Sequence, residues 1–138
     1  MSPAQIVLIE DNPADVLLIK LALHESKIVH VLTEYKSGTE ALRLLFEESQ
    51  RLIPDAILLD LNTPRTDGFD TARRLRQHFP EVPITIMSSS RARADKQSAA
   101  VEGLVYLEKS SELDVFLASI GTVVKDMLQR FPQRLPFG

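Results

Sequence analysis

Carboxylates stand directly after two apolar runs of the sequence. Glu10 and Asp11 follow residues 6–9 (IVLI), and Asp60 follows residues 56–59 (AILL). Apolar runs of this length, bounded by turn residues, are typical of strands that are buried on both faces of a parallel sheet. At the carboxyl end of such a strand, Asp60 could serve as a nucleophile, as a metal ligand or as the cap of a following helix. The residues that would lie beside it must distinguish these roles.

Two further polar side chains occupy equivalent positions. Ser88 follows residues 83–87 (PITIM), and Lys109 follows residues 104–108 (LVYLE). Open α/β sheets place their sites at the carboxyl ends of the strands, so we expect all these side chains to open on one side. Crowded carboxylates repel one another and raise each other's pKa unless a cation is present. Oxygen ligands without Cys or paired His favour Mg²⁺, with Mn²⁺ as a second option.

A carboxylate that is held beside Mg²⁺ and a lysine is arranged for phosphoryl transfer. Such a carboxylate can attack a phosphoryl group and carry it as an acyl phosphate, because this reaction depends on positioning and on neutralising the phosphoryl oxygens. Lys109 would supply positive charge, and the Ser88 hydroxyl would donate a hydrogen bond to one of those oxygens. The sequence therefore predicts a phosphoryl acceptor at Asp60.

Five strand–helix pairs must position these side chains. Asn12 and Pro13 are typical of a helix start, Ser37 and Glu40 have the spacing of a capping box, and Asp67 is a candidate cap for a third helix. Strands and helices in alternation predict a single α/β domain with a five-stranded parallel sheet covered by helices on both faces. Of the possible strand orders, the doubly wound order 2-1-3-4-5 would bring the three carboxylates together.

The helices differ in how much apolar surface they can bury. Residues 13–25 carry a broad apolar face, so we expect this helix to sit deep in the fold. The segment 91–101 has the weakest anchorage and should shift most easily; its candidates for burial are Ala92, Ala94, Ala99, Ala100 and Val101. The last helix, from residue 113 to 131, has a nearly heptad apolar stripe that is wider than one sheet face needs.

The composition limits the class of protein. The 138 residues fit one domain, for which we expect bounds of 1–130, followed by a tail at 131–138. Sixteen basic residues against 19 acidic ones give a net charge of -3, which argues against direct binding to nucleic acid. The absence of cysteine excludes disulfides, thiolate catalysis and cysteine-bound zinc. We find no signal peptide and no apolar run near the ~20 residues that cross a membrane, so we expect a soluble cytoplasmic protein.

Over about residues 5–130, the chain resembles the receiver domains of two-component response regulators. The resemblance implies a flavodoxin-like (βα)5 fold and phosphorylation by a sensor histidine kinase. It also implies site roles by similarity. Glu10 and Asp11 would be the acidic pair that holds Mg²⁺, Asp60 the phosphoacceptor, and Asn62 the residue that gives a backbone carbonyl to the metal. Ser88 would be the hydroxyl switch, Lys109 the conserved lysine, and Tyr106 the aromatic residue that changes rotamer on activation.

Two positions depart from the usual family pattern. Ser110 follows Lys109 where the family usually has proline, so we expect no cis peptide bond there. Ser88 replaces the commoner threonine but keeps the hydroxyl. The Lys-Ser pair, the motif at residues 11–15 (DNPAD) and the extended carboxyl terminus are most similar to stand-alone receivers that partner bacterial phytochromes and related histidine kinases. Such receivers often dimerise, so we expect a homodimer through the last helix and the tail; the competing interpretation is a frayed terminus.

Three functions compete. The first is a signalling module, not an enzyme, in which a phosphoryl group on Asp60 biases the conformation of the segment 91–101. The second is a phosphohydrolase of the haloacid-dehalogenase type, which requires a second aspartate two residues after the nucleophile, where this chain has Asn62. The third is a receiver that only acts as a scaffold without being phosphorylated. The complete set of acidic, hydroxyl and lysine residues favours the first function.

Overall fold

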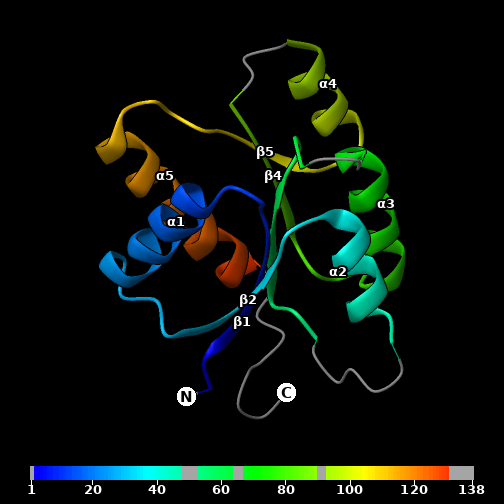
Figure 1. Cartoon of the computed structure of the whole chain (residues 1–138), viewed down its shortest axis with the longest axis horizontal. Coiled ribbons are helices and arrows are strands. Elements are labelled where there is room, and N and C mark those ends of the chain that lie inside the picture. The colour runs from blue at the N-terminus through cyan, green and yellow to red at the C-terminus, as the bar shows by residue number, and fades with distance from the viewer. Residues whose placement is uncertain (1, 48–52, 64–66, 90–92, 131–138) are drawn as a thin grey trace.

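The computed structural model describes residues 2–47, 53–63, 67–89 and 93–130 (Figure 1). Five strands alternate with five helices in these residues, as the sequence predicts. The elements are β1 (Ala4–Ile9), α1 (Pro13–Glu25), β2 (His30–Tyr35), α2 (Gly38–Leu45), β3 (Ala56–Asp60), α3 (Gly68–His78), β4 (Ile84–Ser88), α4 (Arg93–Val101), β5 (Val105–Glu108) and α5 (Leu113–Arg130). The tail at 131–138, to which we assigned part of a dimer contact, lies outside the described residues.

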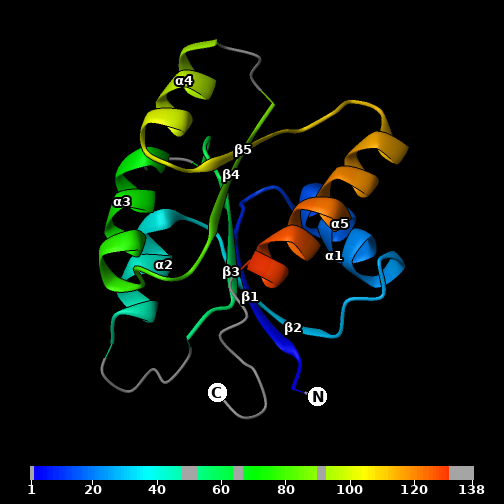
Figure 2. The same cartoon turned by 180° about the vertical axis from the view of Figure 1, so that it is seen from behind.

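The strands form one parallel sheet in the order β2-β1-β3-β4-β5. This order confirms the predicted doubly wound, flavodoxin-like topology. Helices α1 and α5 cover one face of the sheet, and α2, α3 and α4 lie on the other (Figures 1 and 2). Because β1 pairs directly with β3, Ile9 lies opposite Leu59. The residues that follow these two, Glu10 and Asp60, therefore emerge at the same edge.

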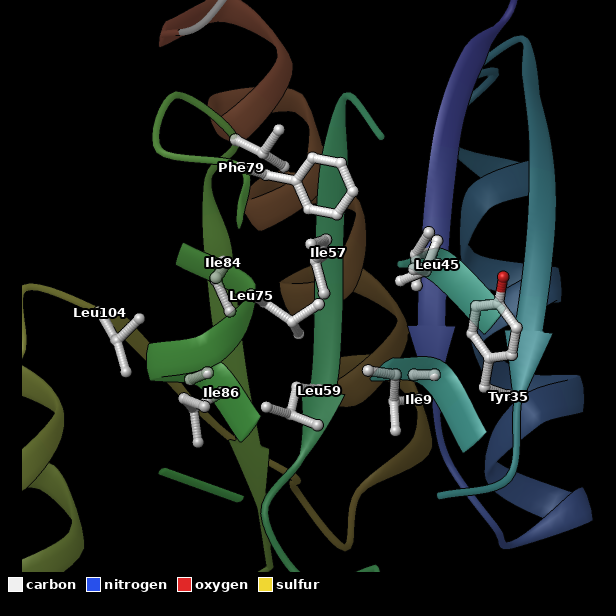
Figure 3. Close-up of a cluster of buried hydrophobic side chains, with 14 of the residues drawn as sticks. Ile9, Tyr35, Leu45, Ile57, Leu59, Leu75, Phe79, Ile84, Ile86 and Leu104 are labelled. Carbon is white, nitrogen blue, oxygen red and sulfur yellow. The ribbon is translucent and has the colours of Figure 1, made fainter. Parts of the chain in front are cut away.

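Strands β1 and β3 are apolar on both faces because helices cover both faces of the sheet. On one face, Ile9, Ile57 and Leu59 pack against side chains of α2 and α3 (Figure 3). On the other face, Leu8 and Leu58 pack against α1 and α5. Each fully buried Leu or Ile stabilises the fold by about 1.5–3 kcal/mol relative to an exposed one. The strand ends that carry Glu10 and Asp60 are thus held by apolar packing on both faces of the sheet.

The predicted helix starts are confirmed. The side chain of Asn12 accepts hydrogen bonds from the backbone N–H groups of Ala14 and Asp15, with Pro13 in the first turn of α1. Asp67 caps α3 by accepting from the N–H groups of Phe69 and Asp70. Since Asp67 takes this role, Asp60 is not needed as a helix cap. That leaves the roles of nucleophile and metal ligand.

The Ser37 cap of α2 is also confirmed, with one difference. Its hydroxyl accepts from the N–H group of Glu40, as a capping box requires. The Glu40 carboxylate, however, accepts from the N–H group of Lys36 and not from that of Ser37.

Helix α1 is buried on one face only, so the expectation that it sits deep in the fold was wrong. Ile19, Ala22 and Leu23 are buried, whereas Leu17 is 66% exposed and Leu21 is 40% exposed. The buried residues face the sheet and α5. Leu17 and Leu21, one turn apart, lie on the opposite face of the helix, where no described element covers them.

Helix α4 is weakly anchored, as expected, but it buries less than the sequence pattern indicates. Among its described side chains, Ala99 is the buried one, while Ala100 is exposed and Val101 is 88% exposed. The expected burial of Ala100 and Val101 was therefore wrong; the side chains of Ala92 and Ala94 lie outside the described residues.

Most of the α5 stripe is core: Phe116, Leu117, Ile120, Val124 and Met127 are buried.

The surplus apolar surface of α5 lies at its start, where Leu113 and Val115 are exposed. Within the described part of the chain, we find no helix that is both long enough and apolar enough to cross a membrane.

Candidate functional site

The predicted site residues converge at the carboxyl edge of the sheet. Glu10 follows β1, Asp60 ends β3, Ser88 ends β4 and Lys109 follows β5. The backbone ties the last two together, because the N–H group of Lys109 donates to the carbonyl of Ser88 at 2.8 Å. Side chains from four strand ends thus share one small volume.

Three carboxylates form an acidic cluster at this edge. Glu10, Asp11 and Asp60 each offer one carboxylate oxygen, and these oxygens all lie within 4.8 Å of one another. Glu10 and Asp60 are buried, whereas Asp11 is exposed at the mouth of the cluster. An all-oxygen set that is open to solvent on one side fits a hard divalent cation that keeps several water ligands. The residues present therefore fit the metal that the sequence predicts.

Lys109 lies against this cluster and is largely buried. Its Nζ atom donates to Glu10 Oε1 at 2.8 Å and to Asp15 Oδ2 at 2.9 Å, and it lies 3.4 Å from Asp60 Oδ2. Asp15 was missed as a site residue by the sequence reasoning, which assigned it only a favourable place in the first turn of a helix. The position of Asp15 could have revealed this role, because the first turn of α1 begins at the edge of the sheet from which Lys109 emerges.

Burial and crowding shift the proton affinities of this site. The pKa of Glu10 rises from its ordinary value of 4.5 to about 7, mainly because burial disfavours the charged carboxylate. The neighbouring Asp60 raises this pKa further, and the hydrogen bond from Lys109 offsets only part of the rise. For Lys109, burial lowers the pKa, but hydrogen bonds to Asp15 and Glu10 outweigh it, so the pKa lies above its ordinary value. The ammonium therefore stays charged.

Asn62 contacts the site through its side chain and its N–H group. Its Nδ2 atom donates to Ser88 Oγ at 3.2 Å, and its backbone N–H donates to Asp60 Oδ1 at 3.1 Å. These bonds fix both the phosphoacceptor candidate and the buried Ser88 hydroxyl. The metal-binding role of the Asn62 backbone carbonyl stays a prediction.

Tyr106 on β5 is half-buried and packs against the core on the α2 and α3 face. Lys96 of α4 lies over its ring, with Nζ 6.0 Å from the ring centroid, and pairs with Glu108 at 3.6 Å. One lysine of the weakly anchored helix thus contacts the strand that carries Tyr106. The change of rotamer expected for Tyr106 stays a prediction.

Two residues in the loops around the site, Gly68 and Ser110, have local structural roles. A Cβ atom on Gly68 would lie 2.6 Å from Leu61 Cδ1 and 3.0 Å from the backbone of Leu61, so any larger residue would force Leu61 to shift where α3 begins against the loop after Asp60. No cis peptide bond occurs in the described residues, as we expected for Lys109-Ser110. The Ser110 hydroxyl accepts from the N–H group of Glu112 and shapes the turn into α5.

Comparison with known families agrees with this geometry. Residues 6–121 match the family described as the response regulator receiver domain. The chain belongs to this family. The receiver domain is 33% identical over 123 residues to response regulator Rcp1 of Synechocystis sp., and the aligned region covers 83% of this chain and 82% of Rcp1.

Solved structures of receivers are similar over most of the chain. The phosphorylated cyanobacterial phytochrome response regulator RcpA superimposes with a TM-score of 0.83 at 28% identity, covering 94% of this receiver and 96% of RcpA. The Mn²⁺-bound form of Rcp1 gives a TM-score of 0.77 at 29% identity, covering 88% and 91% of the two chains. The resemblance to phytochrome-associated receivers is thereby confirmed.

Other curated relatives are much longer. The receiver domain is 37% identical to a protein-glutamate methylesterase/protein-glutamine glutaminase of Syntrophus aciditrophicus, but it spans 30% of the length of that relative. It spans 23% of a second such protein, from Methanospirillum hungatei. The similarity to these enzymes is confined to their receiver part, so it assigns no esterase chemistry to this chain.

Proposed function

We propose that this receiver domain is a single-domain response regulator that accepts a phosphoryl group on Asp60 from a phosphohistidine of a sensor histidine kinase. The observation that carries the proposal is the environment of the Asp60 carboxylate. It is buried at the carboxyl edge of the sheet, within the acidic cluster, and 3.4 Å from the Lys109 ammonium. An acidic cluster beside a lysine allows one carboxylate to be both a metal ligand and a phosphoryl acceptor.

The acidic cluster would hold one Mg²⁺ ion. Glu10, Asp11 and Asp60 would each give a carboxylate oxygen, and Asn62 would give its backbone carbonyl. When bound, Mg²⁺ would neutralise negative charge on the phosphoryl oxygens and on the crowded carboxylates. Mn²⁺ would serve in its place, a choice that the Mn²⁺-bound form of the related Rcp1 supports.

The residues of the chain have distinct parts in the transfer. One Asp60 oxygen attacks phosphorus, an O–P bond forms, the P–N bond to the donor histidine breaks, and the imidazole leaves with the electron pair. The Lys109 ammonium and the Ser88 hydroxyl then donate to the phosphoryl oxygens. The N–H group of Asn62, bonded to Asp60 Oδ1, keeps the carboxylate in one orientation during the attack.

The proposed output is a change at α4 and β5. A phosphoryl group can shift a conformational equilibrium only if it interacts differently with the two states. Ser88 ends β4 and Tyr106 lies on the adjacent β5, so a hydroxyl that moves toward the phosphoryl group would alter the space beside Tyr106. Lys96 contacts the Tyr106 ring and would transmit the change to α4, whose small buried surface offers little resistance.

The other end of α4 is held more firmly. Arg73 of α3 pairs with Glu102 at 2.7 Å, and Arg76 donates to the backbone carbonyls of Glu102 and Gly103. We interpret this end as the pivot and the Lys96 end as the moving part.

The proposed partners follow from the relatives. A bacteriophytochrome-type kinase is the candidate donor, because RcpA and two bacteriophytochrome response regulators are among the similar structures. Exposed Leu113 and Val115 at the start of α5 support a homodimer through the carboxyl-terminal elements. We expect signalling in the cytoplasm, through a protein surface and without direct binding to nucleic acid, since the net charge is -3.

Phosphotransfer tests the proposal. The chain and its Asp60→Asn variant are incubated with phosphorylated candidate kinases and, separately, with acetyl phosphate and Mg²⁺. We expect one acid-stable, base-labile label on the wild type and none on the variant. If the wild type takes no label, the remaining function is that of a scaffold that is not phosphorylated. Steady hydrolysis of a generic phosphomonoester would instead support the phosphohydrolase, although Asn62 occupies the position of its required acid.

A further inference from the structure

Asp15 contacts the site lysine without belonging to the acidic cluster. Its Oδ2 atom lies 2.9 Å from Lys109 Nζ, nearly as close as the 2.8 Å contact of Glu10. The side chains of Asp15 and Lys109 are 24% and 12% exposed, so the contact is mostly shielded from water. Asp15 belongs to α1 and not to a strand end, and the metal-fitting group among the described residues does not include it.

The ordinary local role of such a residue is already taken. A carboxylate in this position of the first turn commonly accepts from the N–H group of the N-cap residue. Here the N-cap is Asn12, and its N–H group donates to Glu10 Oε2 at 3.3 Å. The Asn12 side chain in turn accepts from the N–H group of Asp15. The start of α1 is therefore capped without the Asp15 carboxylate, which is left for Lys109.

The geometry of the ammonium suggests what this contact does. An ammonium has three N–H donors. Glu10 and Asp15 accept from two of them, and Asp60 Oδ2 lies at 3.4 Å, where the third can point. An oxygen of a phosphoryl group on Asp60 would accept that third donor without displacing the other two partners. Asp15 and a phosphoryl group therefore need not compete for the lysine.

We propose that Asp15 is a positioning residue that tethers the Lys109 ammonium so that its third donor faces the phosphoryl site on Asp60. The inference rests on the proposed function. Its physical basis is preorganisation: a free lysine side chain must be immobilised when the phosphoryl group binds, whereas a tethered one is already in place. Glu10 alone is a weaker tether, because a metal ion would share its charge.

Two variants separate the tether from simple charge. Asp15→Ala and Asp15→Asn remove the same negative charge, but Asn keeps an oxygen that can accept from the ammonium. Any general electrostatic effect is thus common to both variants. Asp114, an exposed acid in the first turn of α5, gives a matched control pair, Asp114→Ala and Asp114→Asn. Melting curves of all four variants establish that each is folded.

The experiment titrates each protein with beryllium fluoride at saturating Mg²⁺, as a mimic of the phosphoryl group, and measures binding by ¹⁹F NMR. We expect Asp15→Ala to bind between about twofold and about tenfold more weakly than Asp15→Asn, the range for immobilising one flexible side chain. The Mg²⁺ affinity measured without beryllium fluoride should be the same in the two variants. The two Asp114 variants should not differ in either measurement.

Equal beryllium fluoride affinity of Asp15→Ala and Asp15→Asn would overturn the tether. A second readout needs no ligand: the Lys109 ammonium protons should exchange with water faster in Asp15→Ala than in Asp15→Asn. Unchanged exchange would also count against the tether. If the wild type binds no beryllium fluoride and takes no label from acetyl phosphate, the proposed function fails, and the inference fails with it. If the wild type binds beryllium fluoride and the two Asp15 variants bind it equally well, the inference is refuted but the proposed function is not.

Discussion

The Nζ atom of Lys109 lies 2.8 Å from Oε1 of Glu10, although the two residues are 99 positions apart in the chain. Strands β3 and β4 lie between the strands that deliver them, so the lysine side chain extends along the edge of the sheet to reach the acid. Both groups are buried or nearly so. Breaking such a pair by removing one partner commonly costs about 3–5 kcal/mol, because it leaves an uncompensated charge. We therefore expect residues of the proposed site to contribute to the stability of the fold as well.

Removing the charge of Asp60 should stabilise the metal-free protein. Asp60→Asn relieves repulsion with Glu10 and Asp11, while Lys109 keeps its two closer partners, Glu10 and Asp15. We expect a gain of about 1 kcal/mol, or about 3–5 °C in melting temperature, measured with a chelator present. Asp114→Asn on exposed α5 surface should leave the melting temperature nearly unchanged. A lower melting temperature for Asp60→Asn would show that repulsion does not dominate.

The stability of the metal-free protein should fall between pH 4.5 and pH 7 because of Glu10. Its pKa is raised on folding to about 7, so the folded state binds more protons than the unfolded state in this window. The stabilisation is fully present below pH 4.5 and is lost as the pH rises through 7; it amounts to at most about 3 kcal/mol. Denaturant unfolding at pH 5.0 and 7.5 measures it. Glu10→Gln, which cannot titrate, should show a smaller difference between the two pH values.

Divalent metal should stabilise the wild type, and Asp11 should be needed for this. A ligand at 100 times its dissociation constant stabilises the folded state by about 2.7 kcal/mol. Asp11 is exposed, so Asp11→Asn should change the metal-free melting temperature little but should reduce the rise caused by Mg²⁺ or Mn²⁺. Thermal unfolding with and without each metal provides the measurement. An undiminished rise in Asp11→Asn would place the metal elsewhere.

Gly68→Ala should destabilise the protein by about 1–3 kcal/mol, because the new methyl group meets the backbone of Leu61, which has little freedom to shift. Gly121→Ala offers a matched contrast. There the nearest atom is the Ser26 hydroxyl, which can rotate away, so the loss should be smaller. Denaturant unfolding of both variants compares them. A larger loss for Gly121→Ala would mean that the contact between Ser26 and α5 is the tighter one.

Lys96→Ala should loosen α4 without a large effect on global stability. The pair with Glu108 is about half exposed on the lysine side, and surface pairs contribute about 0–1 kcal/mol. The expected effect is local: faster amide hydrogen exchange in α4 than in the wild type, with α3 unchanged. Lys125→Ala on the exposed side of α5 serves as the control. Equal exchange in α4 of Lys96→Ala and the wild type would show that Lys96 does not anchor the helix.

The sequence by itself determined the elements of this receiver and the strand ends at which the proposed site lies. Apolar runs ending in Glu10, Asp60 and Ser88 identify buried parallel strands, and local turn chemistry at Asn12 and Asp67 marks the helix starts. These signals lie within a few contiguous residues, so period and capping rules are enough to find them. Several strand orders were compatible with this pattern, and the doubly wound order was favoured because it brings Glu10, Asp11 and Asp60 together.

Only the tertiary structure decided which side chains meet across elements. Asp15 and Lys109 are 94 positions apart, and their contact depends on how α1 is rotated against the edge of the sheet. The same rotation leaves Leu17 exposed, although its type predicts burial. The periodicity of a helix shows which residues share a face, but the direction of that face is set by the packing of the sheet and α5. Long-range contacts of this kind are decided by the whole fold and not by any local stretch of sequence.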